Sequence, residues 1–298
     1  MTKMHENEFL INESMVQKLL DEQCPFLANL PLTPIPSTGT EHTLFRLGKD
    51  YIIRLPRVEW SIESVNKTIE KEFKWVPQLA KSLKMSIAEP IFKGKPANDY
   101  PWSWTIAKWN DGHNPDFEKA DEYNLLAKDL AYFLNDLHSV TLPNGPLSRR
   151  GLPLLKLDIE TKKAIAELEG EINTQTVTEL WTQLLNIPIW NHSHVWVHGD
   201  FLPGNILVKN NRLNAVIDFS DLGVGDPACD LIIAWSLFNS ASRQLFRTYL
   251  ENIDNDTWER GRGWALSIAL IMLPYYKYSN PTMATLARIM INNVINNA

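Results

Sequence analysis

The stretch that decides the fold is Trp196–Ser220, which reads WVHGDFLPGNILVKNNRLNAVIDFS. Its apolar segments Ile206–Val208 and Leu213–Ile217 have the length and the hydrophobicity of short strands. The Asn210-Asn211 pair between them readily takes the left-handed backbone conformations that tight turns require. The pattern therefore predicts a β-hairpin, preceded by a polar and turn-rich loop at 198–205.

Three polar residues flank this hairpin. Asn205 precedes the first strand, Asp218 follows the second, and Asp200 lies on the adjacent loop. Antiparallel pairing brings the start of the first strand and the end of the second to the same place. Two carboxylates and an amide are hard oxygen ligands, suited to Mg²⁺ and, through it, to phosphate.

The spacing of these residues resembles a known signature. His198-Gly199-Asp200, an Asn five residues later and Ile217-Asp218-Phe219 after the hairpin match the order of the kinase catalytic and metal-binding residues. The His-Gly-Asp form, with Asp-Leu-Gly-Val-Gly-Asp-Pro-Ala-Cys-Asp at 221–230, is similar to the aminoglycoside phosphotransferase family of small-molecule kinases. The resemblance is specific over 190–238 and looser from Gly39 to the C-terminus.

The resemblance implies a fold and an activity. The fold is α+β and protein-kinase-like, with a small β-rich N-terminal lobe and a larger, mainly helical C-terminal lobe. The activity is Mg²⁺-dependent transfer of the γ-phosphate of ATP or GTP to a hydroxyl of a small molecule. Asp200 would accept or orient the proton of the attacking hydroxyl, and Asn205 and Asp218 would hold the metal.

Neighbouring polar residues are interpreted as structural. We expect His198 to brace the loop through hydrogen bonds, and Asp226 and Asp230 to cap the following helix and fix the loop, because a helix N-terminus favours acidic side chains. Two positions depart from the related patterns. Ser220 stands where protein kinases have Gly, and Leu202 stands where relatives often have His.

The same resemblance requires nucleotide-binding groups in the first third of the chain. Gly39 precedes the strand at 43–47 and is the candidate for the phosphate-covering loop, although an ordinary turn would look the same. Arg54 shares a strand face with Ile52 and would reach the phosphates, unless it is a surface arginine. Glu72 is its expected acidic partner, with Glu70 and Glu63 as alternatives. Backbone groups of Ala107–Trp109 would meet the base.

Hydrophobic periodicity outlines the remaining elements. Residues 62–83 read as a helix that ends or kinks near Trp75, because Pro77 lies inside it. Strands are expected at 43–47, 50–55, 87–91 and 104–109, and in an island at 195–218. The other helices are expected at 12–23, 123–138, 158–168, 176–185, 228–238, 241–252, 256–276 and 281–296. The loop at 110–115 is the predicted boundary between a nucleotide-binding lobe, 1–109, and a catalytic and substrate-binding lobe, 110–298.

Composition narrows the class of protein. The 298 residues carry 29 Lys and Arg against 35 Asp and Glu, a net charge of −6, with no basic run longer than a dipeptide, so we expect no nucleic-acid partner. The two cysteines exclude a disulfide scaffold. The polar N-terminus lacks the apolar core of a signal peptide, and the apolar stretch 265–276 is too short to span a membrane. We therefore expect a cytoplasmic protein.

The acceptor stays open at this level. The aminoglycoside branch of the family suggests a cationic acceptor, and an acidic chain is compatible with one. Macrolides, choline, homoserine, fructosamines and other metabolites are acceptors elsewhere in the family. The alternative function is a non-catalytic, kinase-like module that binds nucleotide or regulates a partner. A protein kinase is disfavoured because Gly225-Asp226-Pro227 leads directly into a helix, which leaves little room for an activation loop.

Overall fold

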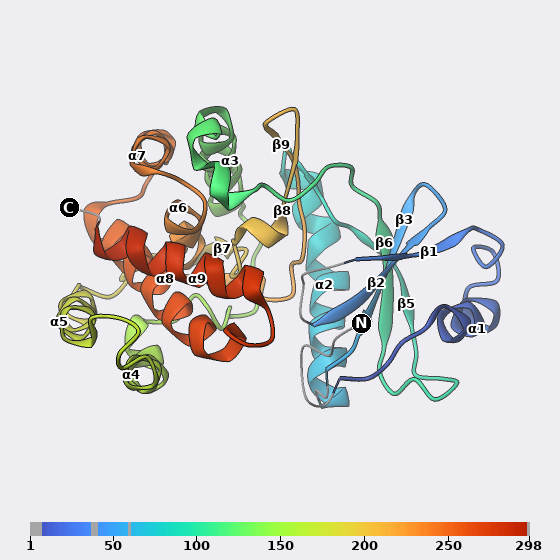
Figure 1. Cartoon of the computed structure of the whole chain (residues 1–298). Coiled ribbons are helices and arrows are strands. Elements are labelled where there is room, and N and C mark those ends of the chain that lie inside the picture. Colours follow the sequence, from blue (N-terminus) through green and yellow to red (C-terminus); the bar gives the residue numbers. More distant parts are fainter. Residues whose placement is uncertain (1–7, 37–40, 59–60, 297–298) are drawn as a thin grey trace.

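The computed structural model describes residues 8–36, 41–58 and 61–296. Two lobes lie side by side, one built on a β-sheet and the other mainly helical (Figure 1). The α+β, two-lobed fold expected from the sequence is thus confirmed. Gly39, the candidate for the phosphate-covering loop, lies outside the described residues.

The N-terminal lobe is built on an antiparallel sheet in the order β1-β2-β3-β6-β5. These strands are β1 (Leu32–Ile35), β2 (His42–Leu47), β3 (Tyr51–Pro56), β6 (Trp104–Lys108) and β5 (Pro90–Gly94). β2 and β3 form the predicted hairpin, whose turn contains Gly48 at a φ of 58°. Pro34 lies in β1, which is an edge strand, where a missing backbone N–H is tolerated.

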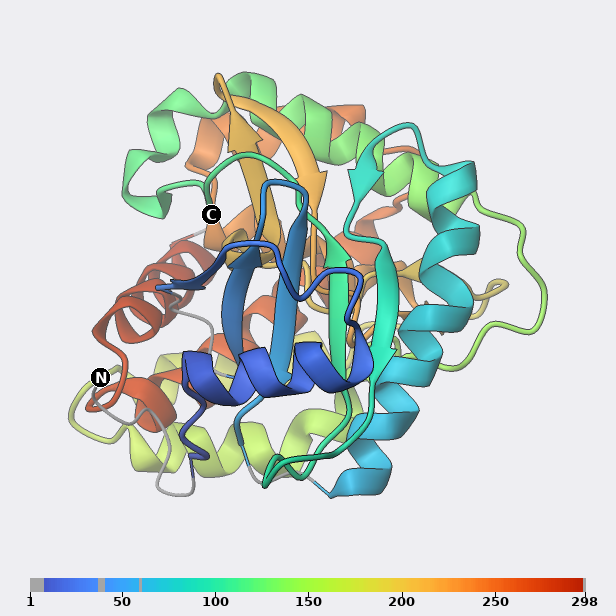
Figure 2. The same cartoon turned by 90° about the vertical axis from the view of Figure 1, so that its right-hand side faces the viewer.

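Two helices complete this lobe. α1 (Glu13–Gln23) crosses one face of the sheet and buries Val16, Leu19 and Leu20 against it (Figure 2). α2 (Ile62–Ser82) runs beside β5 and stands between the sheet and the helical lobe (Figure 1). Both begin with a polar N-cap, Asn12 and Ser61, whose side-chain oxygens accept backbone N–H groups.

α2 corrects one expectation, since it neither ends nor is split near Trp75 but continues through Pro77 to Ser82. Val76 and Leu79, which flank the proline, are buried at 1% and 0% exposure. Burying that apolar face offsets the hydrogen bond that proline cannot make. The side chain of Gln78 also donates to the carbonyl oxygen of Lys74 at 2.6 Å.

The strand expected at 87–91 is a second correction, because it is two strands in two sheets. β4 (Ser86–Ile87) pairs in parallel with a strand of the other lobe, and β5 starts only at Pro90. Pro90 lacks a backbone N–H, and a register shift follows between Pro90 and Phe92. The chain therefore leaves one lobe and enters the other within a segment that local hydrophobicity shows as continuous.

The C-terminal lobe contains the larger hydrophobic core. Its helices are α3 (Asn124–His138), α4 (Asp158–Glu167), α5 (Thr174–Leu185), α6 (Ile233–Ser236), α7 (Ser240–Tyr249), α8 (Asn255–Tyr276) and α9 (Pro281–Ile295). The helix expected at 228–238 is a 3₁₀ segment, Pro227–Ile232, that leads into the short α6. No helix in the described part of the chain combines the length and hydrophobicity needed to cross a membrane.

Small sheets of this lobe position the polar loop. β8 (Ile206–Lys209) and β9 (Arg212–Val216) form the predicted hairpin, and Asn210 and Asn211 in its turn have φ values of 54° and 57°. β9 also pairs with β4. β7 (Val195–Val197), which leads into the polar loop, pairs with β10 (Gly223–Gly225), a strand that hydrophobicity did not predict. The boundary between the lobes at residues 109 and 110 remains a prediction from the sequence.

Candidate active site

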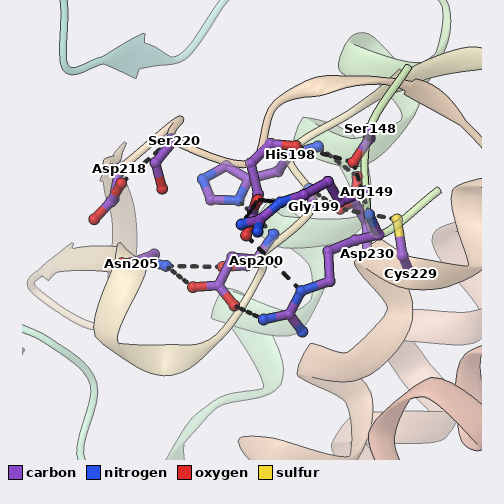
Figure 3. A network of polar contacts seen from close by, with 12 residues as sticks. Ser148, Arg149, His198, Gly199, Asp200, Asn205, Asp218, Ser220, Cys229 and Asp230 are labelled. Carbon is purple, nitrogen blue, oxygen red and sulfur yellow. Dashed lines mark hydrogen bonds and ion pairs between the residues drawn. The ribbon is translucent and has the colours of Figure 1, made fainter. Parts of the chain in front are cut away.

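The hairpin brings Asp200, Asn205 and Asp218 together as the sequence predicts (Figure 3). The backbone N–H of Ile217 donates to the carbonyl oxygen of Asn205 at 3.0 Å, which closes the end of the hairpin. The Asn205 amide nitrogen donates to Asp200 Oδ2 at 2.9 Å and to the Asp200 carbonyl oxygen at 2.8 Å. This leaves Oδ1 as the carboxylate oxygen of Asp200 that Asn205 does not use.

Asp218 adopts a left-handed backbone with a φ of 59°, which is uncommon for a residue other than glycine. Its Oδ1 accepts from Arg54 Nη2 at 2.9 Å and from the backbone N–H of Ser220 at 3.3 Å. Burial alone would raise the pKa of this carboxyl, but the charges of Arg54 and His42 outweigh it and hold the pKa well below its usual range. Ser220 itself has no positive φ, so a glycine is not required there.

Arg54 links the two lobes. Besides Asp218, it contacts Glu72 of α2 through Nη1, 3.3 Å from Oε1. The side chains of Arg54 and Glu72 are 14% and 6% exposed, so this is a buried ion pair. Of the alternative partners, Glu70 pairs instead with Lys93 on the surface, at 3.1 Å. Glu63 lies at the N-terminal end of α2, in its first turn.

His198 braces the loop, as expected. It is fully buried, its Nδ1 accepts from the backbone N–H of Asp200 at 3.2 Å, and its Nε2 lies 3.0 Å from the carbonyl oxygen of Ile217. A carbonyl requires a donor and an N–H requires a lone pair, so these partners fit the neutral imidazole with its proton on Nε2. The ring thereby ties the residue Asp200 to the strand that ends before Asp218.

Asp226 and Asp230 also take the structural roles expected of them. Asp226 caps the 3₁₀ segment through Ala228 N–H at 3.0 Å and forms a buried ion pair with Arg260 at 2.7 Å. Asp230 has no exposed surface and accepts the backbone N–H groups of His198 and Gly199 at 2.9 and 2.8 Å. It therefore fixes the backbone immediately before Asp200.

A segment that the sequence interpretation missed lies against this loop. We call residues 146–151 the strap. It runs along β10, with Val224 N–H donating to Pro146 O at 2.7 Å, Ser148 N–H to Val224 O at 3.1 Å, and Asp226 N–H to Gly151 O at 3.1 Å. The approach is close because glycines face it. A Cβ on Gly223 would lie 2.5 Å from the Ser148 nitrogen, and one on Gly225 would lie 2.5 Å from the Gly151 Cα.

The strap delivers two arginines to the site. Arg149 Nη2 lies 2.7 Å from Asp221 Oδ1 (Figure 3). Arg150 Nη2 lies 3.7 Å from Asp200 Oδ1, and its Nε lies 3.8 Å from Asp221 Oδ2. The only local sign was an Arg-Arg dipeptide in a loop, which has no periodic pattern. The spacing Gly223-x-Gly225 opposite Gly145 and Gly151 was the available signal, but it has meaning only once the strap is paired.

Charges are concentrated around Asp200. Burial raises the pKa of its carboxyl above the ordinary value, Arg150 opposes this, and Asp221 adds to it. Glu41, just before β2, also interacts electrostatically with these carboxylates. Burial and then the carboxylates of Asp218, Asp221 and Asp200 raise the pKa of Glu41 to about 7. Several carboxylates near Asp200 thus attract the arginines around it.

Ala107 and Trp109 lie at the end of β6 and just beyond it. Ala107 is paired with Ile52 of β3 and is 2% exposed. The backbone N–H of Trp109 donates to the carbonyl oxygen of Asp50 at 2.8 Å, and that of Lys108 donates to Glu89 at 3.1 Å. These two donors are thus already used within the N-terminal lobe.

The end of the hairpin has the donor chemistry that Mg²⁺ requires. The Asn205 nitrogen is committed to Asp200, which leaves its amide oxygen as a ligand, and the Asp218 carboxyl is ionised. Among the described residues, no group of three or more His, Cys, Asp or Glu side chains could hold a metal. Mg²⁺ commonly binds through one or two protein oxygens, substrate phosphates and water, so this sparse set fits the ion.

Comparisons with known proteins agree with this geometry. A sequence profile of the phosphotransferase enzyme family matches residues 32–264. An aminoglycoside 3'-phosphotransferase of Salmonella typhimurium is 27% identical over 146 residues, 46% of this chain and 53% of that protein. The match thus spans about half the length of this curated relative.

Solved structures share the fold. A GDP complex of an aminoglycoside 2'-phosphotransferase-IIIa mutant superimposes with a TM-score of 0.75 at 16% identity, over 96% of this chain and 98% of that one. The macrolide 2'-phosphotransferase of Brachybacterium faecium gives 0.61 at 17% identity, over 94% and 98%. With the profile match over most of its length, the chain belongs to the phosphotransferase enzyme family.

Proposed function

We propose that this protein is a Mg²⁺-dependent small-molecule kinase that transfers the γ-phosphate of ATP or GTP to a hydroxyl group. The observation that carries the proposal is the meeting of Asp200, Asn205 and Asp218 at one end of the hairpin, with Arg54 of the other lobe bonded to Asp218. A relative named for aminoglycoside phosphorylation supports it. The reaction would take place in the cytoplasm, where both nucleotides are abundant.

The N-terminal lobe would bind the nucleotide. Arg54 provides a guanidinium fork that matches phosphate oxygens, and Glu72 holds that fork in place. The base would lie beside Ala107 and Trp109. Because the N–H groups of Lys108 and Trp109 are already bonded, recognition there would use other backbone groups of this segment. Gly39 is retained as part of the proposed phosphate-covering loop.

The C-terminal lobe would carry out the transfer. Asn205 and Asp218 would hold Mg²⁺, which offsets the charge of the nucleotide phosphates. Asp200 would accept a hydrogen bond from the acceptor hydroxyl through Oδ1 and take its proton as the new bond forms. In a loose transition state this positioning contributes more than strong base catalysis. Asn205 and His198 hold Asp200 for that task.

The acceptor would be a small hydroxyl compound. The names of similar proteins support testing aminoglycosides and macrolides first as acceptors. A cationic acceptor would be attracted by the carboxylates of Asp200, Asp218 and Asp221. Nucleic acid and membranes are not among the proposed partners, because the net charge of −6 does not favour either surface.

The test is Asp200→Asn, with Asp136→Asn as the matched control on a surface carboxylate that pairs with Lys84. Melting temperatures with ATP or GTP, with and without Mg²⁺, measure binding, since a ligand of the native state raises them. Phosphate transfer to aminoglycosides, macrolides and amino alcohols measures turnover. We expect Asp200→Asn to keep the Mg²⁺-dependent shift and to lose about 100- to 10,000-fold in turnover.

Full turnover in Asp200→Asn would overturn the role of that residue. Nucleotide binding by the unmodified protein without transfer to any acceptor, and without nucleotide hydrolysis, would favour the non-catalytic module. Absence of any Mg²⁺-dependent shift with either nucleotide would overturn the proposal as a whole.

A further inference from the structure

Arg150 makes no side-chain hydrogen bond in the part of the chain that the structure describes, whereas Arg54 and Arg149 do. Its guanidinium approaches Asp200 Oδ1 and Asp221 Oδ2 only to 3.7 and 3.8 Å. Both distances exceed those of a hydrogen bond. Within the described residues no hydrogen bond from this guanidinium is made, whereas its neighbour Arg149 is bound to Asp221 at 2.7 Å. Arg150 thus presents free donors beside the proposed catalytic carboxylate, and its side chain is 30% exposed.

The position of these donors follows from the bonding of Asp200. Oδ2 is taken by Asn205, so Oδ1 is the oxygen available to an acceptor hydroxyl. Arg150 Nη2 is 3.7 Å from that Oδ1. A hydroxyl bonded to Oδ1 would therefore have a guanidinium beside it. The phosphoryl group moves toward the hydroxyl oxygen during transfer, and hence toward Arg150.

The two other arginines near this site, Arg54 and Arg149, are already bonded to carboxylates. Arg54 is bonded to Glu72 and Asp218 on the nucleotide side. The loop after Asp200 offers Leu202, an apolar side chain that is 8% exposed. A phosphoryl group in transit carries its charge on equatorial oxygens, and fixed donors aimed at that charge are an effective means of stabilising it.

From these contacts we infer that Arg150 is a further catalytic residue. It donates hydrogen bonds to the γ-phosphoryl oxygens as the group passes to the acceptor. The bond between the γ-phosphorus and the β–γ bridging oxygen breaks, with its electron pair leaving on the nucleoside diphosphate. The bond to the acceptor oxygen forms, and the hydroxyl proton passes to Asp200. Arg150 exchanges no proton. The inference rests on the proposed function.

The strap fixes the backbone position from which the Arg150 side chain reaches Asp200. Its hydrogen bonds to Val224 and Asp226 hold residues 146–151 along β10. The Arg150 backbone N–H also donates to Ser148 Oγ at 3.2 Å, and that hydroxyl donates to the Asp221 carbonyl at 2.9 Å. A donor placed before the reaction needs no reorganisation during it.

The test uses a mimic of the transferring group and needs no knowledge of the acceptor. Affinities of the full chain are measured for the nucleoside diphosphate with Mg²⁺, alone and with fluoroaluminate, which mimics the planar phosphoryl group. Arg150→Ala is compared with Arg150→Lys and with Arg149→Ala, the neighbour on the same strap. We expect Arg150→Ala to bind the diphosphate unchanged and the fluoroaluminate complex about 100-fold more weakly.

Further readouts separate a catalytic from a structural role. Arg150→Lys should recover part of the fluoroaluminate affinity, and added guanidinium ion should restore part of the nucleotide hydrolysis lost in Arg150→Ala. Arg149→Ala removes the hydrogen-bonded partner of Asp221 and should change both affinities by the same factor. Equal weakening of the two complexes by Arg150→Ala, or no weakening of either, would overturn the inference while leaving the proposed function intact. Failure of the unmodified protein to bind any Mg²⁺–nucleotide complex would overturn both.

Discussion

Two arginines approach the candidate active site from opposite lobes, and they are held in opposite ways. Arg54 is 14% exposed and bridges Glu72 and Asp218 with contacts of 3.3 and 2.9 Å. Arg150 is 30% exposed and approaches its carboxylates only to 3.7 and 3.8 Å. The first is already hydrogen-bonded to two carboxylates, and the second is hydrogen-bonded to none.

This difference separates two tasks that a cation can perform. A buried guanidinium that is hydrogen-bonded to two carboxylates stabilises the contact between the lobes and the ionised form of Asp218. A guanidinium with free donors contributes little to the resting protein, because exposed or long ion pairs are weak. Its interactions are then available for a charge that exists only during the reaction.

The largest expected effect comes from removing the ion pairs of Arg54. Arg54→Met leaves Glu72 and Asp218 without their shared cation, and we expect it to lower the free energy of unfolding by about 3 kcal/mol. Urea denaturation measures this, with Arg54→Lys as the control that keeps the charge and loses the fork. A loss below 1 kcal/mol would show that the ion pairs of Arg54 do not stabilise the protein. Arg54 would then not differ from Arg150 in this respect.

A smaller effect is expected from disturbing the strap that carries Arg150. In Gly223→Ala, the added Cβ would lie 2.5 Å from the Ser148 nitrogen and 2.6 Å from the Pro146 oxygen, so the strap must shift. We expect a loss of about 1–3 kcal/mol in urea denaturation. Gly204→Ala is the control, since nothing lies within 4 Å of its Cβ position. Equal stability of both variants would mean that the strap adapts freely and does not fix Arg150.

The smallest effect probes the surroundings of Arg54 by pH. Burial and then the Arg54 charge lower the pKa of His42 from 6.5 to about 3. Between these values the unfolded chain binds a proton that the folded protein does not, so acid favours unfolding over this range. We expect His42→Phe to reduce the loss of stability between pH 7.5 and 5.5 by up to about 1.4 kcal/mol. Melting temperatures at the two pH values measure it, and identical losses in both proteins would contradict the expectation.

Local patterns predicted the part of the site that the chain builds by itself. The turn residues Asn210 and Asn211 and the apolar segments around them determine the hairpin, and the hairpin alone brings Asn205 to Asp218. The pairing of Arg54 with Glu72 followed from the family resemblance, since a strand and a helix 18 residues apart carry no local sign of contact.

What escaped prediction depends on partners that are distant in the sequence. β4 belongs with β9 rather than β5, although Ser86 and Pro90 are four residues apart. The strap pairs with β10 across more than 70 residues, and its arginines have no pattern of their own. Pro77 was given too much weight, because the burial of Val76 and Leu79 that keeps α2 intact becomes visible only in the folded core.

α2 serves both cores, and this has a mechanical consequence. Val65 and Ile69 pack into the core of the N-terminal lobe, while Trp75, Val76 and Leu79 pack into that of the C-terminal lobe. The helix therefore contributes to the hydrophobic cores of both lobes. Glu72 is located between the two sets, close to the axis of any relative rotation. A rotation of the lobes about this helix would then lengthen the contact of Arg54 with Asp218 while sparing that with Glu72, so Glu72 would keep the arginine in place.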